Sequence, residues 1–455
     1  MRRTKPIATD AMKRLLIIPA IFAITLVLAQ PTSADVDGTT TLKESVVDAV
    51  KHHPQIKALL FNREAVSRDL SASLGRFFPS LDLSSQYGFQ KYNSSTARAQ
   101  DTEGRSRRAS DSTLTLTQNV FDGMDRLSAY QGSQARLESA ESRLFDTVES
   151  IALNAIRAHI DMVRIRKLVT LAEGNITDHQ GVLDSIAERV AGGAGSKADE
   201  MQARGRVARA ETTLITYTGD LRTAEAEYVR QTGKTPGPLA ELDYHPEYVP
   251  ASLDQILETA LDNNPKIKTY KAEIVVTEQD RNVTRSNYYP DLDIKVSSRY
   301  TDHLDGSQAY LRDDRAMLAM SWNLFSSGTD YQSTQAASAR IRQAQQDLQD
   351  TIDDLTRQVA SAWAEYGTAV GQIGKHQEAL QYSIESRDMY LMQFNVGQRS
   401  LLDVLDAINE VFSNSVLLET AQSNRDFTLY KFLNLQGQLI KTFEVSENTY
   451  NTLPQ

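Results

Sequence analysis

The most constraining feature of this sequence is that it contains the same unit twice. Four segments of the first half recur in the second half, two of them 211 residues later and two of them 204 residues later. The matched pairs are 41–57 with 252–268, 78–83 with 289–294, 118–121 with 322–325, and 193–199 with 397–403. The offsets differ by seven residues, which a shorter polar loop in the second half explains. Such self-similarity predicts two copies of one structural unit.

Each unit is expected to run in the order helix, strand, loop, strand, very long helix, helix. We assign the first unit to residues 35–232 and the second to residues 251–438, followed by a tail at 439–455. Residues 233–250 lie between the units and contain four prolines, so we expect them to form a linker.

Two short segments in each unit alternate apolar and polar residues, which is the pattern of a strand with one apolar face. In the first of them, Leu81, Leu83, Tyr87 and Phe89 alternate with polar residues. The predicted strands cover about 79–92, 111–121, 290–301 and 315–325. The loops inside each pair are polar and charged.

Four strands of this length match the span of tilted strands in a transmembrane barrel. A soluble sandwich would need many more strands than this helical chain offers. Four strands cannot close a barrel, and open sheet edges are not tolerated in lipid, so several copies must share one barrel. Two copies would give a barrel filled by side chains, whereas three give twelve strands and room for a pore. The pattern therefore favours a homotrimer with a twelve-stranded barrel.

The longest predicted helices are 124–190 and 329–395, and neither contains proline. Their apolar residues recur every seven positions, as in Leu137, Leu144 and Ile151, which is coiled-coil periodicity. A helix of this length is roughly 100 Å long and must project into an aqueous space. Shorter helices, 196–232 and 400–437, follow them. An exported coiled-coil structural protein or adhesin stalk is the alternative, but it leaves the amphipathic strands unexplained.

The N-terminal 34 residues have the features of a secretory signal peptide. Lys13 and Arg14 precede an apolar run, 15–29, and small residues at 32–34 provide a cleavage pattern. Elsewhere, no stretch approaches the roughly 20 apolar residues that a membrane helix requires. We therefore expect an exported mature chain.

Composition excludes several classes of function. The net charge is −10 and becomes −14 once the first 34 residues, with five basic residues and one acidic residue, are removed. An acidic chain is a poor nucleic-acid binder. The chain has no cysteine, which excludes disulfides, thiolate metal sites and a lipid-modified N-terminal cysteine. The seven histidines show no ligand spacing, and no cofactor or enzyme motif is present.

Each long helix ends in a turn that contains glycine, Gly193 in the first unit and Gly397 in the second. Ser196 with Asp199, and Ser400 with Asp403, fit the pattern of a capping box. Asp406 lies on the same helix face as Asp403, and no cap requires it. If copies surround an axis, Asp403 and Asp406 form two rings of carboxylates that attract cations.

The duplicated plan, the tip motif at 396–407 and the strand exit at 323–328 resemble the TolC-type outer-membrane efflux and secretion channels over nearly the whole mature chain. This resemblance implies a mainly helical homotrimer with transmembrane β-structure, in which a twelve-stranded barrel continues into an α-helical periplasmic tunnel. It places a mixed α/β belt around 233–250 and the C-terminal end. It also implies that Asp403 and Asp406 form the periplasmic constriction and that Arg399 and the first tip, around Asp199, hold it shut. An aromatic hydroxyl normally joins these links, but Phe394 cannot donate a hydrogen bond.

Without an ATPase motif, the chain is expected to be a passive, gated channel rather than an enzyme. The resemblance implies an outer-membrane location in a Gram-negative bacterium, extending into the periplasm. It also implies a periplasmic adaptor and an inner-membrane ABC or proton-driven transporter as partners. Two uses are open, type I protein secretion and small-molecule efflux.

Overall fold

The structure is a computed structural model that describes residues 38–451 except 100, 102 and 308. The predicted signal peptide, 1–34, lies outside the described residues. The helices and strands of the fold belong to one compact unit, Thr39–Gln455. Among the described residues, no helix is both long enough and apolar enough to cross a membrane.

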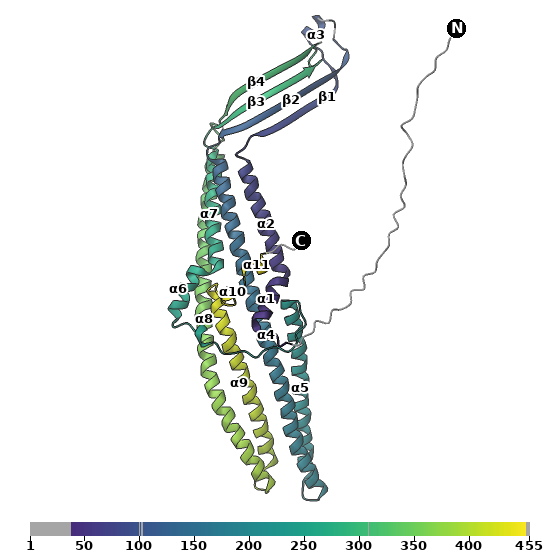
Figure 1. The fold of residues 1–455 in the computed structure, drawn as a ribbon, viewed down its shortest axis with the longest axis vertical. Helices are drawn as coiled ribbons and strands as arrows, with labels where there is room; N and C mark the ends of the chain where they lie inside the picture. Colours follow the sequence, from purple (N-terminus) through teal and green to yellow (C-terminus); the bar gives the residue numbers. More distant parts are fainter. Residues whose placement is uncertain (1–37, 100, 102, 308, 452–455) are drawn as a thin grey trace, which may run out of the picture. The chain divides into compact units, whose positions relative to one another are not determined.

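The elements follow the duplicated order that the sequence predicts (Figure 1). The first repeat consists of α1 (Leu42–His52), α2 (Pro54–Gly75), β1 (Ser80–Lys91), α3 (Ser95–Ala99), β2 (Ser106–Phe121), α4 (Asp125–Ala191) and α5 (Lys197–Thr232). The linker contains a 3-10 turn, η1 (Pro246–Tyr248). The second repeat consists of α6 (Leu253–Asn263), α7 (Pro265–Ser286), β3 (Asp291–Asp302), β4 (Tyr310–Ser321), α8 (Thr329–Asn395) and α9 (Leu401–Leu435), and α10 (Leu439–Thr442) and α11 (Glu447–Tyr450) follow.

The same local chemistry begins corresponding helices in both repeats. Thr41 forms a capping box with Glu44 at the start of α1, and Ser252 accepts a hydrogen bond from the Gln255 N–H at the start of α6. Pro54 and Pro265 occupy the first position of α2 and α7, where a missing N–H costs nothing. The repeat seen in the sequence is therefore a repeat of helix boundaries.

The four strands form one antiparallel sheet in the order β1-β2-β3-β4, so the hairpins of the two repeats pair with each other. The register places apolar residues in rows across one face, such as Leu81, Leu116, Val296 and Ala316. The opposite face of the same stretch carries Asp82, Thr115, Ser297 and Arg315. Many apolar side chains of the first face are exposed, which is what lipid-facing residues require.

The strand limits differ from the predicted ones in the second strand of each hairpin. β2 begins at Ser106 rather than near 111, because Ser106 still pairs with Lys91 although no apolar alternation marks this polar end. β4 covers Tyr310–Ser321 rather than 315–325, because its partner β3 begins at Asp291, opposite Ser321. The short helix α3 in the first loop was not predicted. Pairing, not the apolar pattern, sets these limits.

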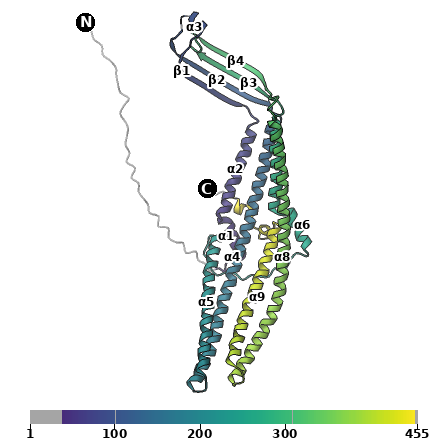
Figure 2. The same ribbon diagram turned by 180° about the vertical axis from the view of Figure 1, so that it is seen from behind.

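The helices α4 and α8 contain 67 residues each and are therefore about 100 Å long. Helix α4 packs along α5, and α8 packs along α9, so each repeat ends in an antiparallel helical hairpin (Figures 1 and 2). Most heptad positions predicted for α4 are buried, including Leu144, Ile151, Ala158 and Ile165. His179, a polar residue at one of these heptad positions, is buried as well.

A large core lies halfway along these helices. We call it the middle, formed by residues 39–60, 144–165, 224–269, 348–366 and 427–450. Two apolar clusters build it, one around Val148, Ile156 and Leu439 and the other around Ile256, Val359 and Phe432. A parallel bridge between Thr40 and Leu239 joins the linker to the residues just before α1. The middle thus gathers both chain ends of the described unit and the linker around the long helices.

Candidate functional site

The turns of the two hairpins lie next to each other, far from the sheet (Figures 1 and 2). We call this region the tip, residues 178–207 and 387–408. One apolar cluster there combines residues from α4, α5, α8 and α9, including Ile186, Val207, Phe394 and Val404. The two hairpins of one chain are therefore packed against each other at the tip.

Both tip turns require glycine. Gly193 and Gly397 have φ of +78°, a left-handed conformation that is strained for other residues. Ser196 then caps α5 by accepting a hydrogen bond from the Ala198 N–H at 3.2 Å. The Asp199 carboxylate has no polar partner among the described residues, so the predicted capping box of the first tip does not form. Asp199 makes no contact with Arg399 within this chain either.

The second tip is also capped by its serine alone. Ser400 Oγ accepts a hydrogen bond from the Asp403 N–H at 3.3 Å. The Asp403 carboxylate lies 3.0 Å from Arg399 Nε, four residues earlier, instead of returning to the cap. This is an ion pair without good hydrogen-bond alignment, because Arg399 Nε has no hydrogen-bond partner among the described residues. The Arg399 guanidinium also stacks on the Tyr390 ring, 3.8 Å from its centre.

Asp406, the carboxylate with no role in a cap, is paired with a residue of the other repeat. Arg206 Nη2 lies 2.5 Å from Asp406 Oδ1 and joins α5 to α9. The Arg206 side chain is 22% exposed, whereas that of Asp406 is 63% exposed. Each of the two predicted ring carboxylates therefore has an arginine partner within its own chain.

Phe394 is buried in the tip cluster, and an arginine from α4 covers it. The Arg189 guanidinium lies 4.5 Å from the centre of the Phe394 ring. Arg189 also donates hydrogen bonds to the Phe394 carbonyl at 3.3 Å and to Asn395 Oδ1 at 3.4 Å. A cation–π contact with backbone hydrogen bonds thus connects the two hairpins at the position where the resemblance led us to expect an aromatic hydroxyl.

A third arginine also crosses between the hairpins. Arg387 of α8 lies 3.7 Å from Asp178 of α4. Burial raises the pKa of Asp178, and Arg387 opposes that shift. Sequence reasoning missed Arg189, Arg206, Arg387 and Tyr390. The repeat alignment could not find them, because Arg189 corresponds to Gln393 and Arg206 to Glu410, so the links differ between the halves.

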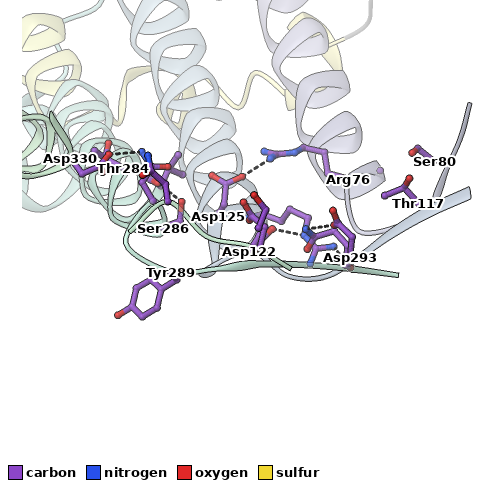
Figure 3. A pocket seen from close by; sticks show the side chains of 18 of the residues that line it. Arg76, Ser80, Thr117, Asp122, Asp125, Thr284, Ser286, Tyr289, Asp293 and Asp330 are labelled. Atoms are coloured by element: carbon purple, nitrogen blue, oxygen red, sulfur yellow. Dashed lines mark hydrogen bonds and ion pairs between the residues drawn. The ribbon is translucent and has the colours of Figure 1, made fainter. Parts of the chain in front are cut away.

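A second polar site lies where the sheet meets the helices (Figure 3). This open pocket has a volume of about 1570 Å³. Its lining includes the acidic residues Asp122, Asp125, Asp291, Asp293 and Asp330. Arg76, at the end of α2, reaches Asp125 in the first turn of α4, and Arg126 pairs with Asp122. Among the described residues, no group of three or more histidines and acids is arranged to hold a metal. The pocket is a wide polar space.

Comparison with known proteins gives one consistent family. A family model described as "outer membrane efflux protein" matches residues 46–234 and 256–435, which are the two repeats. The outer membrane efflux protein BepC of Brucella suis is 23% identical over 336 residues, covering 72% of this chain and 72% of BepC. The outer membrane protein TolC of Escherichia coli is 19% identical over 402 residues, covering 85% of this chain and 79% of TolC.

Solved structures share the fold. The CmeC outer membrane channel of Campylobacter jejuni matches with a TM-score of 0.78 at 14% sequence identity, covering 88% of this chain and 86% of CmeC. At this identity the likeness concerns the fold alone. It confirms the predicted duplicated architecture of paired strands and long helices.

Proposed function

Because this chain belongs to the outer membrane efflux protein family, we propose that it is the passive exit channel of a tripartite export system and is gated at its tip. Family membership places the chain in the outer membrane and makes it a channel protein rather than an enzyme, as the sequence predicted. The proposal covers its assembly, its energy source and its substrate.

The sheet supports assembly into a shared barrel. Strands of 12 residues, as in β1, β3 and β4, span about 40 Å along the strand and about 30 Å when tilted by 40°. That height matches the roughly 30 Å hydrocarbon core of a bilayer. β1 and β4 form the edges of the sheet and pair with no further strand within the described residues. Three copies joined edge to edge would give the twelve-stranded barrel.

Aromatic residues near both ends of the strands support the same arrangement. Phe121 and Tyr289 pack edge to face at the helical end, with ring centres 6.5 Å apart. Tyr300 and Tyr310 stack at the other end, with ring centres 6.1 Å apart. Transmembrane barrels carry such aromatic belts at both interfaces. The pocket of Figure 3 then lies where the barrel wall passes into the helical wall.

We propose that the channel transports small molecules, because the matching family is described as outer membrane efflux proteins. With no ATPase motif in the sequence, a periplasmic adaptor and an inner-membrane transporter would supply the coupling and the energy. Secretion of unfolded polypeptide through the same channel is the competing use. Deletion of the gene should sensitise cells to toxic small molecules; loss of an exported protein without such sensitivity would favour secretion.

The observation that carries this proposal is a sheet with an exposed apolar face on helices that are far longer than a bilayer is thick. Its test is reconstitution of the purified full chain in a planar bilayer. We expect a detergent-extracted trimer that gives discrete conductance steps. Replacement of both Asp403 and Asp406 by alanine should lower the cation selectivity. A water-soluble monomer without conductance would favour the coiled-coil stalk instead.

A further inference from the structure

We propose that the Arg206–Asp406 ion pair is a latch that masks the acidic charge of the entrance and releases that charge when the entrance opens. The inference rests on the proposed function, because it assumes that the tips surround a channel entrance. It concerns a residue, Arg206, that the sequence did not indicate as part of the site. It also adds a link between gating and ion preference.

The two arginine partners belong to different hairpins. Arg399 precedes Asp403 by four residues, so this pair lies within the second hairpin. Arg206 belongs to α5 and Asp406 to α9, so this pair joins the first hairpin to the second. A movement that separates the hairpins leaves the Arg399–Asp403 pair intact and breaks the Arg206–Asp406 pair. Of the two carboxylates Asp403 and Asp406, opening therefore changes the charge environment of Asp406 only.

Arg206 is the fixed partner, and Asp406 is the partner that faces solvent. The Arg206 side chain is mostly buried, and its charge lies near His179 of α4, which is almost fully buried. Burial and, to a smaller extent, the nearby Arg206 charge lower the pKa of His179, so Arg206 lies close to α4 as well as on α5. When the hairpins separate, Arg206 must follow α5. Asp406 is left exposed on α9 without its counter-charge.

The consequence concerns ions that enter the channel. In the closed arrangement both carboxylates of a chain are compensated by arginines. In the open arrangement each chain exposes one additional negative charge at Asp406, which is repeated in every copy around the axis. Rings of carboxylates favour cations. We therefore expect cation preference to increase as the entrance opens, which a fixed pair of acidic rings would not produce.

The test uses two variants that break the same ion pair but leave different charges behind. R206Q removes the latch and leaves the Asp406 carboxylate, so open probability and cation preference should both rise. The permeability ratio of K⁺ to Cl⁻, measured in 0.1 M KCl gradients, should increase by about twofold or more. D406N removes the latch and the carboxylate together, so open probability should rise while the ratio falls below that of the wild type. A purely structural role would move the ratio in the same direction in both variants.

Two further variants control for folding and for position. The exchange R206D/D406R restores an ion pair with reversed charges, and it should recover the low open probability of the wild type. The change K167Q acts away from the tip, where it removes an ion pair between α4 and α9, Lys167 with Glu419 at 3.3 Å, together with the pair that Lys167 makes with Glu241 of the linker at 3.5 Å. It should leave both quantities unchanged. At 1 M KCl the selectivity differences should shrink, because screening then acts over about 3 Å.

A conducting wild type whose open probability and permeability ratio do not change in R206Q would overturn the latch alone. Equal shifts of the ratio in R206Q and D406N would also overturn it. Absence of conductance from the wild-type protein would instead reject the proposed function, and the latch with it.

Discussion

The middle and the tip both connect the two repeats, but they use different chemistry. In the middle, the polar groups that join elements are buried: Glu149 is 1% exposed and His159 is 0% exposed. At the tip, the connecting groups are partly buried arginines, and their partners include the well-exposed Asp406. Removing one partner of a buried pair is costly, whereas exposed ion pairs contribute at most about 1 kcal/mol each. From this difference we propose a fixed middle and a tip that can separate.

One connection in the middle is a chain of hydrogen bonds through a buried histidine. His159 Nε2 lies 3.2 Å from the Ala240 carbonyl, which can only accept, so Nε2 carries the proton of the neutral ring. His159 Nδ1 must then accept from Ser45 Oγ at 2.9 Å, and Ser45 Oγ accepts from the Tyr228 hydroxyl at 2.8 Å. Burial lowers the pKa of His159, which keeps it neutral. The chain joins α1, α4, α5 and the linker.

The second connection in the middle holds the C-terminal segment. The Glu149 carboxyl group of α4 accepts hydrogen bonds from the Leu439 N–H at 3.2 Å and the Ile440 N–H at 3.1 Å. Burial raises the pKa of Glu149 to about 8, although these two hydrogen bonds oppose the shift. The end of the second repeat is thereby attached to the long helix of the first.

Substitution of Glu149 should have the largest effect on the stability of the middle. We expect Glu149→Leu to lower the free energy of unfolding by about 3 kcal/mol, because it leaves two buried N–H groups without partners. Thermal unfolding followed by circular dichroism measures the effect. Glu173→Leu, an exposed position on the same helix, is the control and should change little. Equal stability of the two variants would show that the middle is not held by this group.

The protonation of Glu149 should make the middle sensitive to pH. A carboxyl group with a raised pKa contributes stability that is complete below its unfolded value of 4.5 and is lost as pH rises towards about 8. His159 acts in the opposite sense but only below its ordinary value of 6.5. Between pH 6.5 and 8 we therefore expect stability to fall by up to about 1.4 kcal/mol per pH unit. In Glu149→Gln this slope should disappear, and an unchanged slope would assign the effect to another group.

A smaller effect is expected when the hydroxyl at the end of the histidine chain is removed. Tyr228→Phe deletes one hydrogen bond to Ser45 and should lower the free energy of unfolding by about 1 kcal/mol. Tyr217→Phe, on the same helix, has no such bond in the described part of the chain and serves as the matched control. If both variants unfold at the same temperature, the hydrogen-bonded chain does not stabilise the middle.

The smallest effect on stability is expected at the tip, where the effect on conductance should be largest. Arg189→Ala removes the cation–π contact with Phe394 and the hydrogen bonds to the end of α8. We expect a loss of less than about 1 kcal/mol in unfolding free energy and a higher open probability in planar bilayers. Arg209→Ala, an exposed arginine on α5, should change neither quantity. A large loss of stability with unchanged gating would place Arg189 in the core rather than in a gate.

The sequence predicted the fold well where the signal is local or repeated. The heptad in 124–190 predicted a helix that is now seen at Asp125–Ala191, and the turn glycines Gly193 and Gly397 stand where both repeats require a left-handed residue. The predicted length of β2 was too short at its polar end, because the pairing of Ser106 with Lys91 depends on the partner strand. An apolar pattern cannot indicate a strand end that is held by backbone pairing alone.

The candidate site was predicted only in part. The capping pattern correctly predicted that Ser400 caps the helix and accepts a hydrogen bond from the Asp403 N–H. It also predicted that the Asp403 carboxylate bonds back to the cap, but this bond does not form because the carboxylate pairs with Arg399. The partners Arg206 and Asp406 lie 200 residues apart and have no counterparts in the other repeat. Contacts of this kind depend on how two hairpins pack. Neither spacing nor internal repetition encodes that packing.

The most direct test of a fixed middle and a movable tip is cross-linking with a cleavable thiol reagent. The absence of cysteine makes engineered pairs unambiguous. Arg206→Cys with Asp406→Cys bridges the tip, and Lys167→Cys with Glu419→Cys bridges α4 and α9 about 20 Å nearer the middle. We predict that cross-linking the tip abolishes the open conductance, that cleavage restores it, and that the upper bridge has no effect. Unchanged conductance with the tip cross-linked, or closure by the upper bridge alone, would contradict the account.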